Sequence, residues 1–294
     1  MIRFPDISPK IFSIDVFGIE FTLRWYSMAY IVGFIIAIHI MKYFTSRGDY
    51  WRHNTGPLER AEVNDLITYL ILGVIIGGRL GYVIFYNLDF YLANPSDIPK
   101  VWDGGMSFHG GFLGVVLVAI IYTQSNGILL WSCADLIALA TGPGLMLGRI
   151  ANFINAELWG RPTDVGWGVV FPGAKAQDCP LIVGECARHP SQLYEAGLEG
   201  LFLFIILVIF ARLGALRRPG VITGMFFVIY GSGRYFVEFY RVPDPQFFSN
   251  ENPFGFAFQI GDIGITMGQA LSIPMIAVGL GIVLLKCRVK QFGY

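Results

Sequence analysis

The chain has 294 residues, of which 54% are hydrophobic and only 14% are charged, and its 21 basic side chains balance its 21 acidic ones. Soluble domains carry about 25% charged residues, so this composition excludes an ordinary soluble protein and indicates one that crosses a membrane several times. The neutral balance gives no indication of a nucleic-acid partner. The four cysteines show no zinc-ligand spacing, so we expect neither a metal nor another cofactor.

Seven stretches are apolar enough for membrane-spanning helices, which need about 20 residues each. They centre on residues 25–42, 64–86, 107–123, 133–152, 192–211, 220–239 and 266–286. No internal repeat or long linker separates them. We therefore expect one domain over residues 1–294, an all-α polytopic membrane protein built as a bundle of these transmembrane helices. The longest loop, residues 155–190, follows the fourth span.

The orientation follows from lysine and arginine, which concentrate in short cytoplasmic loops. Basic residues gather after the first, fifth and seventh spans: Lys42, Arg47, Arg52, Arg60, Arg212, Arg217, Arg218, Lys286, Arg288 and Lys290. The opposite loops carry more acid, at Asp89, Asp97, Asp103, Asp244, Glu251 and Asp262. Arg24 and Arg241 oppose this trend weakly. We predict an extracytoplasmic N-terminus and a cytoplasmic C-terminus, which makes 155–190 an extracytoplasmic loop.

Cys179 and Cys186 both lie in this loop. An oxidising compartment would allow a disulfide between them. The short loop that such a bond closes would restrict its geometry. The sequence leaves both states open.

Polar groups recur near the extracytoplasmic ends of the spans. Trp25 and Tyr26 begin the first span, where aromatic residues also act as interfacial anchors. Arg79 lies among glycines in the second span, and a structural and a functional role are equally open. His109 begins the third span in the glycine-rich stretch 102–111. An imidazole titrates at about pH 6.5 in model compounds, which suits proton transfer, although a hydrogen-bonding role is the alternative.

The stretch GRIANFINAELWGR, residues 148–161, places charge at the end of the apolar fourth span. A charge in a bilayer costs roughly 2.5–3.5 kcal/mol on insertion scales, so it indicates a functional site by default. Arg149 and Asn152 share a helix face, and Glu157 follows where the helix should end. The rigid donor fork of arginine suits a phosphate. The alternative is a buried arginine–glutamate pair that fixes helix contacts.

Two more spans carry polar stripes. The stripe on the fifth span consists of Gln192, Glu195 and Glu199, and we expect arginines of other spans to pair with its carboxyls. The stripe on the sixth span consists of Tyr230, Arg234, Glu238 and Arg241. Neutralisation of Arg234 by Glu238 at i+4 would leave Arg241 free for a lipid head group. The shared depth of all these groups predicts a polar cavity that opens outward to an anionic ligand, for which the membrane supplies phospholipid.

The chain resembles the prolipoprotein diacylglyceryl transferase family nearly from end to end. The motifs that carry the resemblance, in the family's order, are RWYSMAY, GGRLGY, VWDGGMSFHGG, GRIANFINAELWGR, RHPSQLYE, YGSGRYFVEFYRVPD and MGQALSIPM. The fourth motif follows the family signature closely, with Ala151 and Ala156 where glycine is common.

The resemblance implies a multi-pass enzyme of the bacterial plasma (inner) membrane that starts lipoprotein maturation. It would transfer the diacylglyceryl group of phosphatidylglycerol, a membrane lipid, to the lipobox cysteine of a prolipoprotein signal peptide. A thioether would form and glycerol phosphate would leave. By motif position, Arg149 and Arg234 resemble the family's essential arginines. Other important family positions match His109, Tyr26, Asn152, Glu157, Gly160, Tyr230 and Glu238.

A thiol of ordinary pKa, about 8.5, is mostly protonated at neutral pH and needs a base or a positive field. We expect His109 to be the base, Arg234 to stabilise developing charge and Arg149 to hold the phosphate. We expect Glu157 and Glu238 to orient the arginines. Substrate binding is expected from Arg79, Arg149, Asn152, Gly160, Gln192, Glu195 and Arg241.

Two other classes stay open at this point. A transporter or flippase for an anionic lipid would use the same arginines and cavity but would form no covalent product. A purely structural scaffold would have little use for intramembrane arginines on several spans. A lipase is not indicated, because the sequence has no G-x-S-x-G motif.

Overall fold

The computed structural model describes residues 1–288 apart from 18, 180, 181, 183, 244–246, 248, 250, 251, 253, 261 and 262. Asp244, Glu251, Asp262 and Lys290, which entered the orientation prediction, lie outside the described residues. All other residues discussed above are described.

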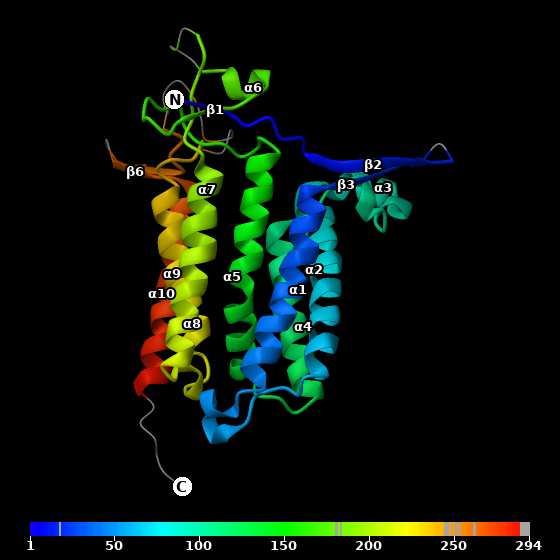
Figure 1. Cartoon of the computed structure of the whole chain (residues 1–294), viewed down its shortest axis with the longest axis vertical. Coiled ribbons are helices and arrows are strands. Elements are labelled where there is room, and N and C mark those ends of the chain that lie inside the picture. Colours follow the sequence, from blue (N-terminus) through cyan, green and yellow to red (C-terminus); the bar gives the residue numbers. More distant parts are fainter. Residues whose placement is uncertain are drawn as a thin grey trace.

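The described part of the chain is a helical bundle, with six helical segments long and apolar enough to cross a membrane (Figure 1). They are α1 (Trp25–Thr45), α2 (Glu62–Tyr86), α4 (Phe108–Ser125), α5 (Leu130–Ile154), the continuous run Ser191–Arg212, and α10 (Met267–Arg288). A shorter apolar helix, α9 (Val221–Val237), is the predicted sixth span. The prediction of an all-α polytopic membrane protein is confirmed.

The run Ser191–Arg212 is not uniform. It begins as α7 (Ser191–Glu195), continues as a π-helix (Ala196–Phe202) and ends as α8 (Leu203–Arg212). π-Helical turns are rare and occur often at functional sites. Glu199, the deepest carboxyl of the predicted stripe, lies in this turn.

Glycines allow close approach of α2 to α4. A Cβ atom on Gly114 would lie 2.0 Å from the carbonyl oxygen of Gly73, and one on Gly110 would lie 2.3 Å from that of Gly77. Backbones that approach this closely compensate for the weak hydrophobic drive between helices in lipid. Gly224 of α9 and Gly279 of α10 meet in the same way, since a Cβ atom on Gly279 would lie 2.7 Å from the Gly224 oxygen.

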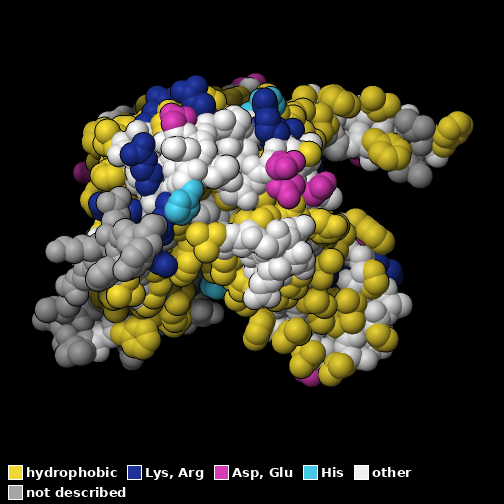
Figure 2. Space-filling model, turned by 90° about the horizontal axis from the view of Figure 1, so that it is seen from below, with side chains coloured by type: hydrophobic (Ala, Val, Ile, Leu, Met, Phe, Trp, Pro, Cys, Tyr) yellow, Lys and Arg dark blue, Asp and Glu magenta, His cyan; other side chains and the backbone are white. Residues whose placement is uncertain are grey.

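The fully buried apolar residues concentrate at the end of the bundle where α1 ends. Side chains from five helices meet there, including Met41, Leu66, Leu136, Leu139, Leu207 and Ile222. The same end carries many basic side chains, as Figure 2 shows from below. The helix ends that carry the predicted site residues gather at the other end (Figure 1).

That other end is covered by strands and loops. β1 (Ile2–Arg3) pairs in parallel with β4 (Val169–Val170), β2 (Lys10–Val16) forms an antiparallel hairpin with β3 (Ile19–Arg24), and β5 (Phe258–Ile260) pairs with β6 (Ile263–Ile265). Residues 155–190 fill the interval between α5 and α7 and include the short helix α6 (Ala174–Gln177). Cys179 and Cys186, whose state the sequence left open, are joined by a disulfide.

Short turns complete the chain. α3 (Leu88–Ala93) follows α2 on the side of the β2–β3 hairpin (Figure 1). Single turns of 3-10 helix lie at Gly48–Tyr50, Arg52–Asn54, Pro95–Asp97, Val101–Asp103 and Ala215–Arg217.

The α2–α4 contact generates a stability prediction. Gly114→Ala should lower the melting temperature in detergent, because the new methyl group overlaps the α2 backbone and such overpacking costs about 1–3 kcal/mol. Gly281→Ala in α10 is the matched control, since a Cβ atom there meets nothing within 4 Å and alanine is the better helix former. Equal melting temperatures for the two variants would contradict this packing.

Candidate active site

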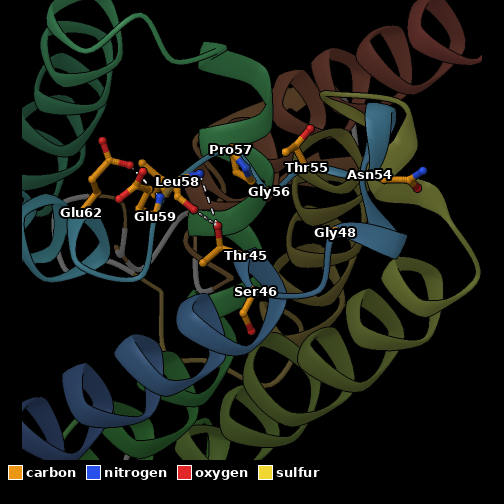
Figure 3. Close-up of a pocket in the computed structure, with 10 residues that line it drawn as sticks. All are labelled: Thr45, Ser46, Gly48, Asn54, Thr55, Gly56, Pro57, Leu58, Glu59 and Glu62. Carbon is orange, nitrogen blue, oxygen red and sulfur yellow. Dashed lines mark hydrogen bonds between the residues drawn. The ribbon is translucent and has the colours of Figure 1, made fainter.

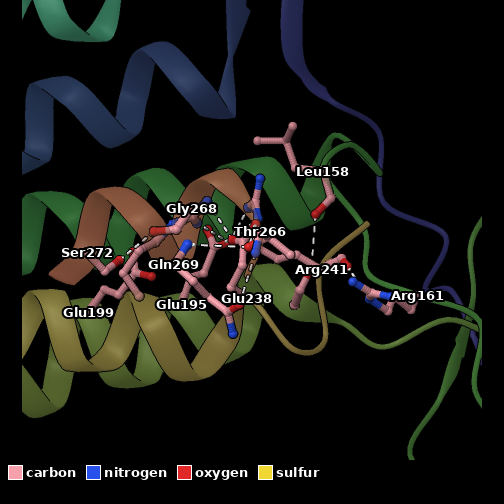
Figure 4. Close-up of polar contacts among 12 residues, drawn as sticks. Leu158, Arg161, Glu195, Glu199, Glu238, Arg241, Thr266, Gly268, Gln269 and Ser272 are labelled. Atoms are coloured by element: carbon pink, nitrogen blue, oxygen red, sulfur yellow. Dashed lines mark hydrogen bonds and ion pairs between the residues drawn. The ribbon is translucent and has the colours of Figure 1, made fainter. Parts of the chain in front are cut away.

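Three arginines and three glutamates form one ionic cluster where α5, the α7 run and α9 approach each other. Arg149 comes from the last turns of α5, Glu195 and Glu199 from the α7 run, and Arg234, Glu238 and Arg241 from the end of α9 and just beyond it. Figure 4 shows Glu195, Glu199, Glu238 and Arg241 together with residues at the start of α10. The expectation that arginines of other spans pair with the carboxyls of the fifth span is confirmed.

Glu195 is the centre of the cluster. The Nε atom of Arg149 lies 2.8 Å from Glu195 Oε2, and Nη1 of Arg234 lies 3.3 Å from Glu195 Oε1. Arg241 pairs with the same Oε1 through its own Nη1 atom. One carboxylate therefore brings together arginines from two spans and from the segment after α9.

The two other carboxylates complete the charge balance. Glu238 Oε2 lies 3.0 Å from Arg234 Nη2 and 3.5 Å from Arg241 Nε. Arg241 is therefore paired, and the alternative that left it free is wrong. Glu199 lies deeper, with its Oε2 atom 3.8 Å from Arg149 Nη2 and neither carboxylate oxygen hydrogen-bonded within the described part of the chain.

The burial of the cluster is uneven. The Glu195 and Glu199 side chains are each 1% exposed, whereas those of Arg149, Arg234 and Arg241 are 24%, 20% and 17% exposed. Buried carboxylates need paired cations, because desolvation of a lone charge is very costly. The carboxylates thus form the inner side of the cluster, and each arginine keeps an accessible edge that can meet an anion.

Glu238 ties the cluster to α10. The hydroxyl of Thr266 donates to Glu238 Oε1 at 3.2 Å, and a Cβ atom on Gly268 would lie 2.5 Å from the Glu238 carboxyl carbon. Figure 4 shows Thr266, Gly268 and Gln269 beside Glu238. The MGQALSIPM motif therefore starts α10 with a residue small enough to admit the glutamate.

The turn after α5 carries a second polar group. Asn152 and Asn155 donate through their Nδ2 atoms to Glu157 Oε1, at 2.8 and 3.2 Å. The prediction that Glu157 orients an arginine needs correction, because in the described residues the arginine cluster pairs with other carboxylates. Gln192, fully buried, donates to the backbone oxygen of Glu157. The turn is thereby attached to α7, one helical turn above Glu195.

The backbone of this turn explains a feature of the signature. The amide of Ala156 donates to the Phe153 oxygen and that of Glu157 to the Asn152 oxygen, at 2.9 and 3.1 Å. This pair of bonds is the Schellman arrangement that ends many helices, and it requires a left-handed residue. Ala156 has a φ of 52°. Glycine adopts this φ at lower cost, which accounts for glycine at this place in the family signature.

Gly160 lies where three backbone segments cross. Its amide donates to the His189 oxygen at 2.9 Å, and a Cβ atom on it would lie 2.4 Å from the Tyr240 oxygen. Gly160 also forms a β-bridge with Arg241. Burial lowers the pKa of the His189 imidazole, which packs against the Tyr240 ring. The absence of a side chain at Gly160 thus lets the chain before Arg241 approach.

Two tyrosines lie within electrostatic range of the cluster, and a third contacts one of them. The Tyr30 hydroxyl donates to that of Tyr26 at 3.3 Å and lies within electrostatic range of Arg149. Tyr230 lies within electrostatic range of Arg149, Arg234 and the two buried glutamates. Tyr30 is not among the site residues predicted from the sequence, although its i+4 spacing from Tyr26 was a signal that could have indicated it.

His109 and Arg79 lie outside the cluster. His109 is an exposed residue in the first turn of α4, with an edge contact to Phe108, and no described hydrogen bond or ion pair joins it to the arginines. Arg79 is 4% exposed and donates to the backbone oxygens of Asp97, Ile98, Gly104 and Gly105. These bonds favour the structural alternative for Arg79, which holds the loop before α4.

Two open pockets lie elsewhere. One of about 470 Å³ is formed by the loop between α1 and α2, at the end remote from the arginines (Figure 3). The other, of about 420 Å³, lies between the Ala156–Trp159 turn and Pro172–Ala176. Neither is lined by the three arginines, so an outward-opening cavity at the cluster stays a prediction.

Comparisons with known proteins agree with the motifs. A family model described as prolipoprotein diacylglyceryl transferase matches residues 14–285. The phosphatidylglycerol–prolipoprotein diacylglyceryl transferase of Ruegeria pomeroyi is 57% identical over 285 residues, which cover 97% of each chain. The proteins of the same name from Roseobacter denitrificans and Methylocella silvestris are 55% and 45% identical, covering 96% of this chain and 96% and 95% of their own.

The Schellman turn predicts that glycine has opposite effects on stability at Ala156 and at Ala151. Ala156→Gly should raise stability by about 1 kcal/mol, because it relieves a left-handed alanine. Ala151→Gly should lower stability by at least about 1 kcal/mol, because this buried residue lies within α5. Thermal unfolding in detergent measures both. A lower melting temperature for Ala156→Gly would contradict the assignment of strain.

Proposed function

The chain belongs to the prolipoprotein diacylglyceryl transferase family, and we propose that it transfers the diacylglyceryl group of phosphatidylglycerol to the lipobox cysteine of a prolipoprotein. A bond forms between the cysteine sulfur and a glycerol CH2 carbon, and the bond from that carbon to the phosphate oxygen breaks. The products are a thioether and glycerol phosphate, and the thiol proton passes to a base. This reaction is the first step of lipoprotein maturation.

The ionic cluster around Glu195 is the observation that carries the proposal. Arg149 and Arg234 reach the same carboxylate from different helices, so their guanidinium groups are close enough to contact one phosphate diester. Both keep an exposed edge, and both already lie in a fixed orientation. Donors fixed before the reaction stabilise developing charge without reorganisation at the moment of reaction.

The arginines and His109 divide the chemical roles. Arg149 holds the phosphate and stabilises the charge on the leaving oxygen. Arg234 stabilises the thiolate electrostatically, since a guanidinium does not act as a neutral base. His109 takes the thiol proton. Catalytic hydrogen bonds are often long until substrates bind, so His109 keeps this role although no described contact joins it to the arginines.

The other residues bind substrate or support the arginines. Glu195 and Glu238 orient the arginines through the ion pairs described above. Substrate contacts are proposed for the polar residues around the cluster and the adjoining turn: Tyr26, Asn152, Glu157, Gly160, Gln192, Tyr230 and Arg241. Arg79 acts indirectly, through the loop that leads to His109.

The enzyme is proposed to lie in the bacterial plasma membrane with its N-terminus outside and its C-terminus in the cytoplasm. Two observations support this orientation. The Cys179–Cys186 disulfide suits an oxidising compartment, and the opposite end of the bundle carries the basic side chains typical of the cytoplasmic side. The cluster then faces the outer leaflet.

Transfer is tested by incubating the purified protein with phosphatidylglycerol and a lipobox peptide. Mass spectrometry should detect a peptide that carries one diacylglyceryl group. A lipid transporter would bind and move the lipid without this adduct, so a stable wild-type protein that forms none would overturn the proposed function.

Arg149→Ala should reduce adduct formation at least about 10²-fold, as expected for loss of a donor to developing charge. Arg212→Ala is the matched control, because Arg212 is an exposed arginine at the far end of the same bundle. Product at near wild-type rate from folded Arg149→Ala would defeat the phosphate role.

His109→Gln should be severely impaired at neutral pH, because glutamine retains hydrogen bonding but takes up no proton. The rate should recover as the pH rises toward the thiol pKa, about 8.5, where thiolate forms without a base. A rate and pH profile equal to those of the wild type would show that another group is the base.

A further inference from the structure

Asp135 is a fully buried carboxylate that the proposed mechanism does not use. It lies in α5, at the end of the bundle opposite the arginine cluster, and is 0% exposed. Its Oδ2 atom accepts from the amide of Gly220 at 2.7 Å, and its Oδ1 atom accepts from both the amide and the hydroxyl of Thr223, each at 2.7 Å. All three donors lie at the start of α9.

These bonds make Asp135 the cap of a neighbouring helix. The first amides of a helix lack intrahelical acceptors, and the N-cap residue of α9 is Gly220, which has no side chain to supply one. A carboxylate at that position also interacts favourably with the helix dipole. α5 therefore caps α9, and α10 contributes Lys286, which acts on the carboxylate and lies over the Trp131 ring of α5.

The cap lies at matching distances from the two arginines. Arg149 follows Asp135 by 14 residues along α5, and Arg234 follows Gly220 by 14 residues along α9. At 1.5 Å per residue, each stretch measures about 21 Å. The cap thus places the two arginines at one depth, where both reach Glu195.

Within the described residues, the bonds of Asp135 are the only hydrogen bonds that join α5 directly to α9. At its other end, α9 is linked to α10 through Glu238 and Thr266. Towards the other end of the two helices, Arg149 and Arg234 meet through Glu195, and Tyr230 lies within electrostatic range of Arg149. Apolar contacts alone allow a helix to slide along its axis at lower cost than a three-bond cap does.

We propose that Asp135 is a positioning residue for the transfer reaction. By capping α9 from α5, it sets the axial register between these helices and so aligns Arg149, which holds the phosphate, with Arg234, which stabilises the thiolate. The inference rests on the proposed function, because alignment matters only if both arginines act on one substrate.

The test uses full-length Asp135→Asn and Thr223→Val in the adduct assay. Asp135→Asn replaces one accepting carboxylate oxygen with an NH2 group that faces the amide N–H of Gly220 or Thr223. Thr223→Val removes only the hydrogen bond that the Thr223 hydroxyl donates to Asp135. Tyr122→Phe is the control, because it removes a part-buried hydrogen bond from α4 to Glu62 of α2 and none of the hydrogen bonds that join α5 to α9. Turnover is normalised to folded protein, and KM is measured separately for lipid and peptide.

For Asp135→Asn we expect kcat to fall about 10–100-fold, as for a misalignment of about 1 Å, with an unchanged KM for the peptide. Thr223→Val should lose less kcat than Asp135→Asn does. Thr223→Ser, which keeps the hydroxyl, should retain the wild-type kcat. Tyr122→Phe should lower the melting temperature but not kcat.

Asp135→Asn with a lower melting temperature and wild-type kcat per folded molecule would overturn the inference and leave Asp135 as a stabilising cap. If this variant does not insert, wild-type kcat in Thr223→Val overturns it equally. If the wild-type protein itself forms no adduct, the proposed function fails and the inference fails with it.

Discussion

The desolvated carboxylate of Glu195 is the constraint on which the half of the molecule that carries the ionic cluster depends. A side chain that is 1% exposed within an apolar bundle carries a charge only if cations surround it. Those cations come from α5, α9 and the segment beyond α9, so the three must converge on one point. The same pairing holds the guanidinium groups still and leaves part of each accessible. The ion pairs around Glu195 therefore both hold the site together and orient the arginines towards an anion.

Apolar packing and polar functional groups lie at opposite ends of the bundle. Fully buried leucine, isoleucine and methionine side chains concentrate at the end remote from the cluster, where they pack as in a soluble core. Glycine contacts bring α2 close to α4, and α9 close to α10, along their lengths. The end with the ionic cluster carries polar groups, turns and a disulfide-linked loop. α9 connects the ends, with Asp135 at its start and Glu238 at its finish.

No single sequence motif predicted all the contacts that its residues make in the site. Glu157 follows Arg149 in the signature, yet it accepts from two asparagines, because the Schellman turn directs the chain away from the helix axis. Arg241 would be left free if Glu238 neutralised only Arg234, but the fold brings Arg241 back to Glu195. Tyr30 lies within electrostatic range of Arg149 on another helix, whereas its i+4 spacing from Tyr26 shows only that the two tyrosines share a face of α1. Each difference arises from a contact between residues that are far apart in the sequence.

The sequence by itself determined the class, the number of spans and the family, because helices in a bilayer must satisfy their own backbone groups and so leave a local, apolar signal. It also identified the charged residues that such an environment makes conspicuous, among them Arg149, Glu195 and Arg234. Only the tertiary structure decided which charges pair, that Glu195 is shared, and that Asp135 caps α9. These choices depend on the relative rotation and axial position of helices. Helix packing sets both, and the hydrophobic pattern along one chain segment does not encode them.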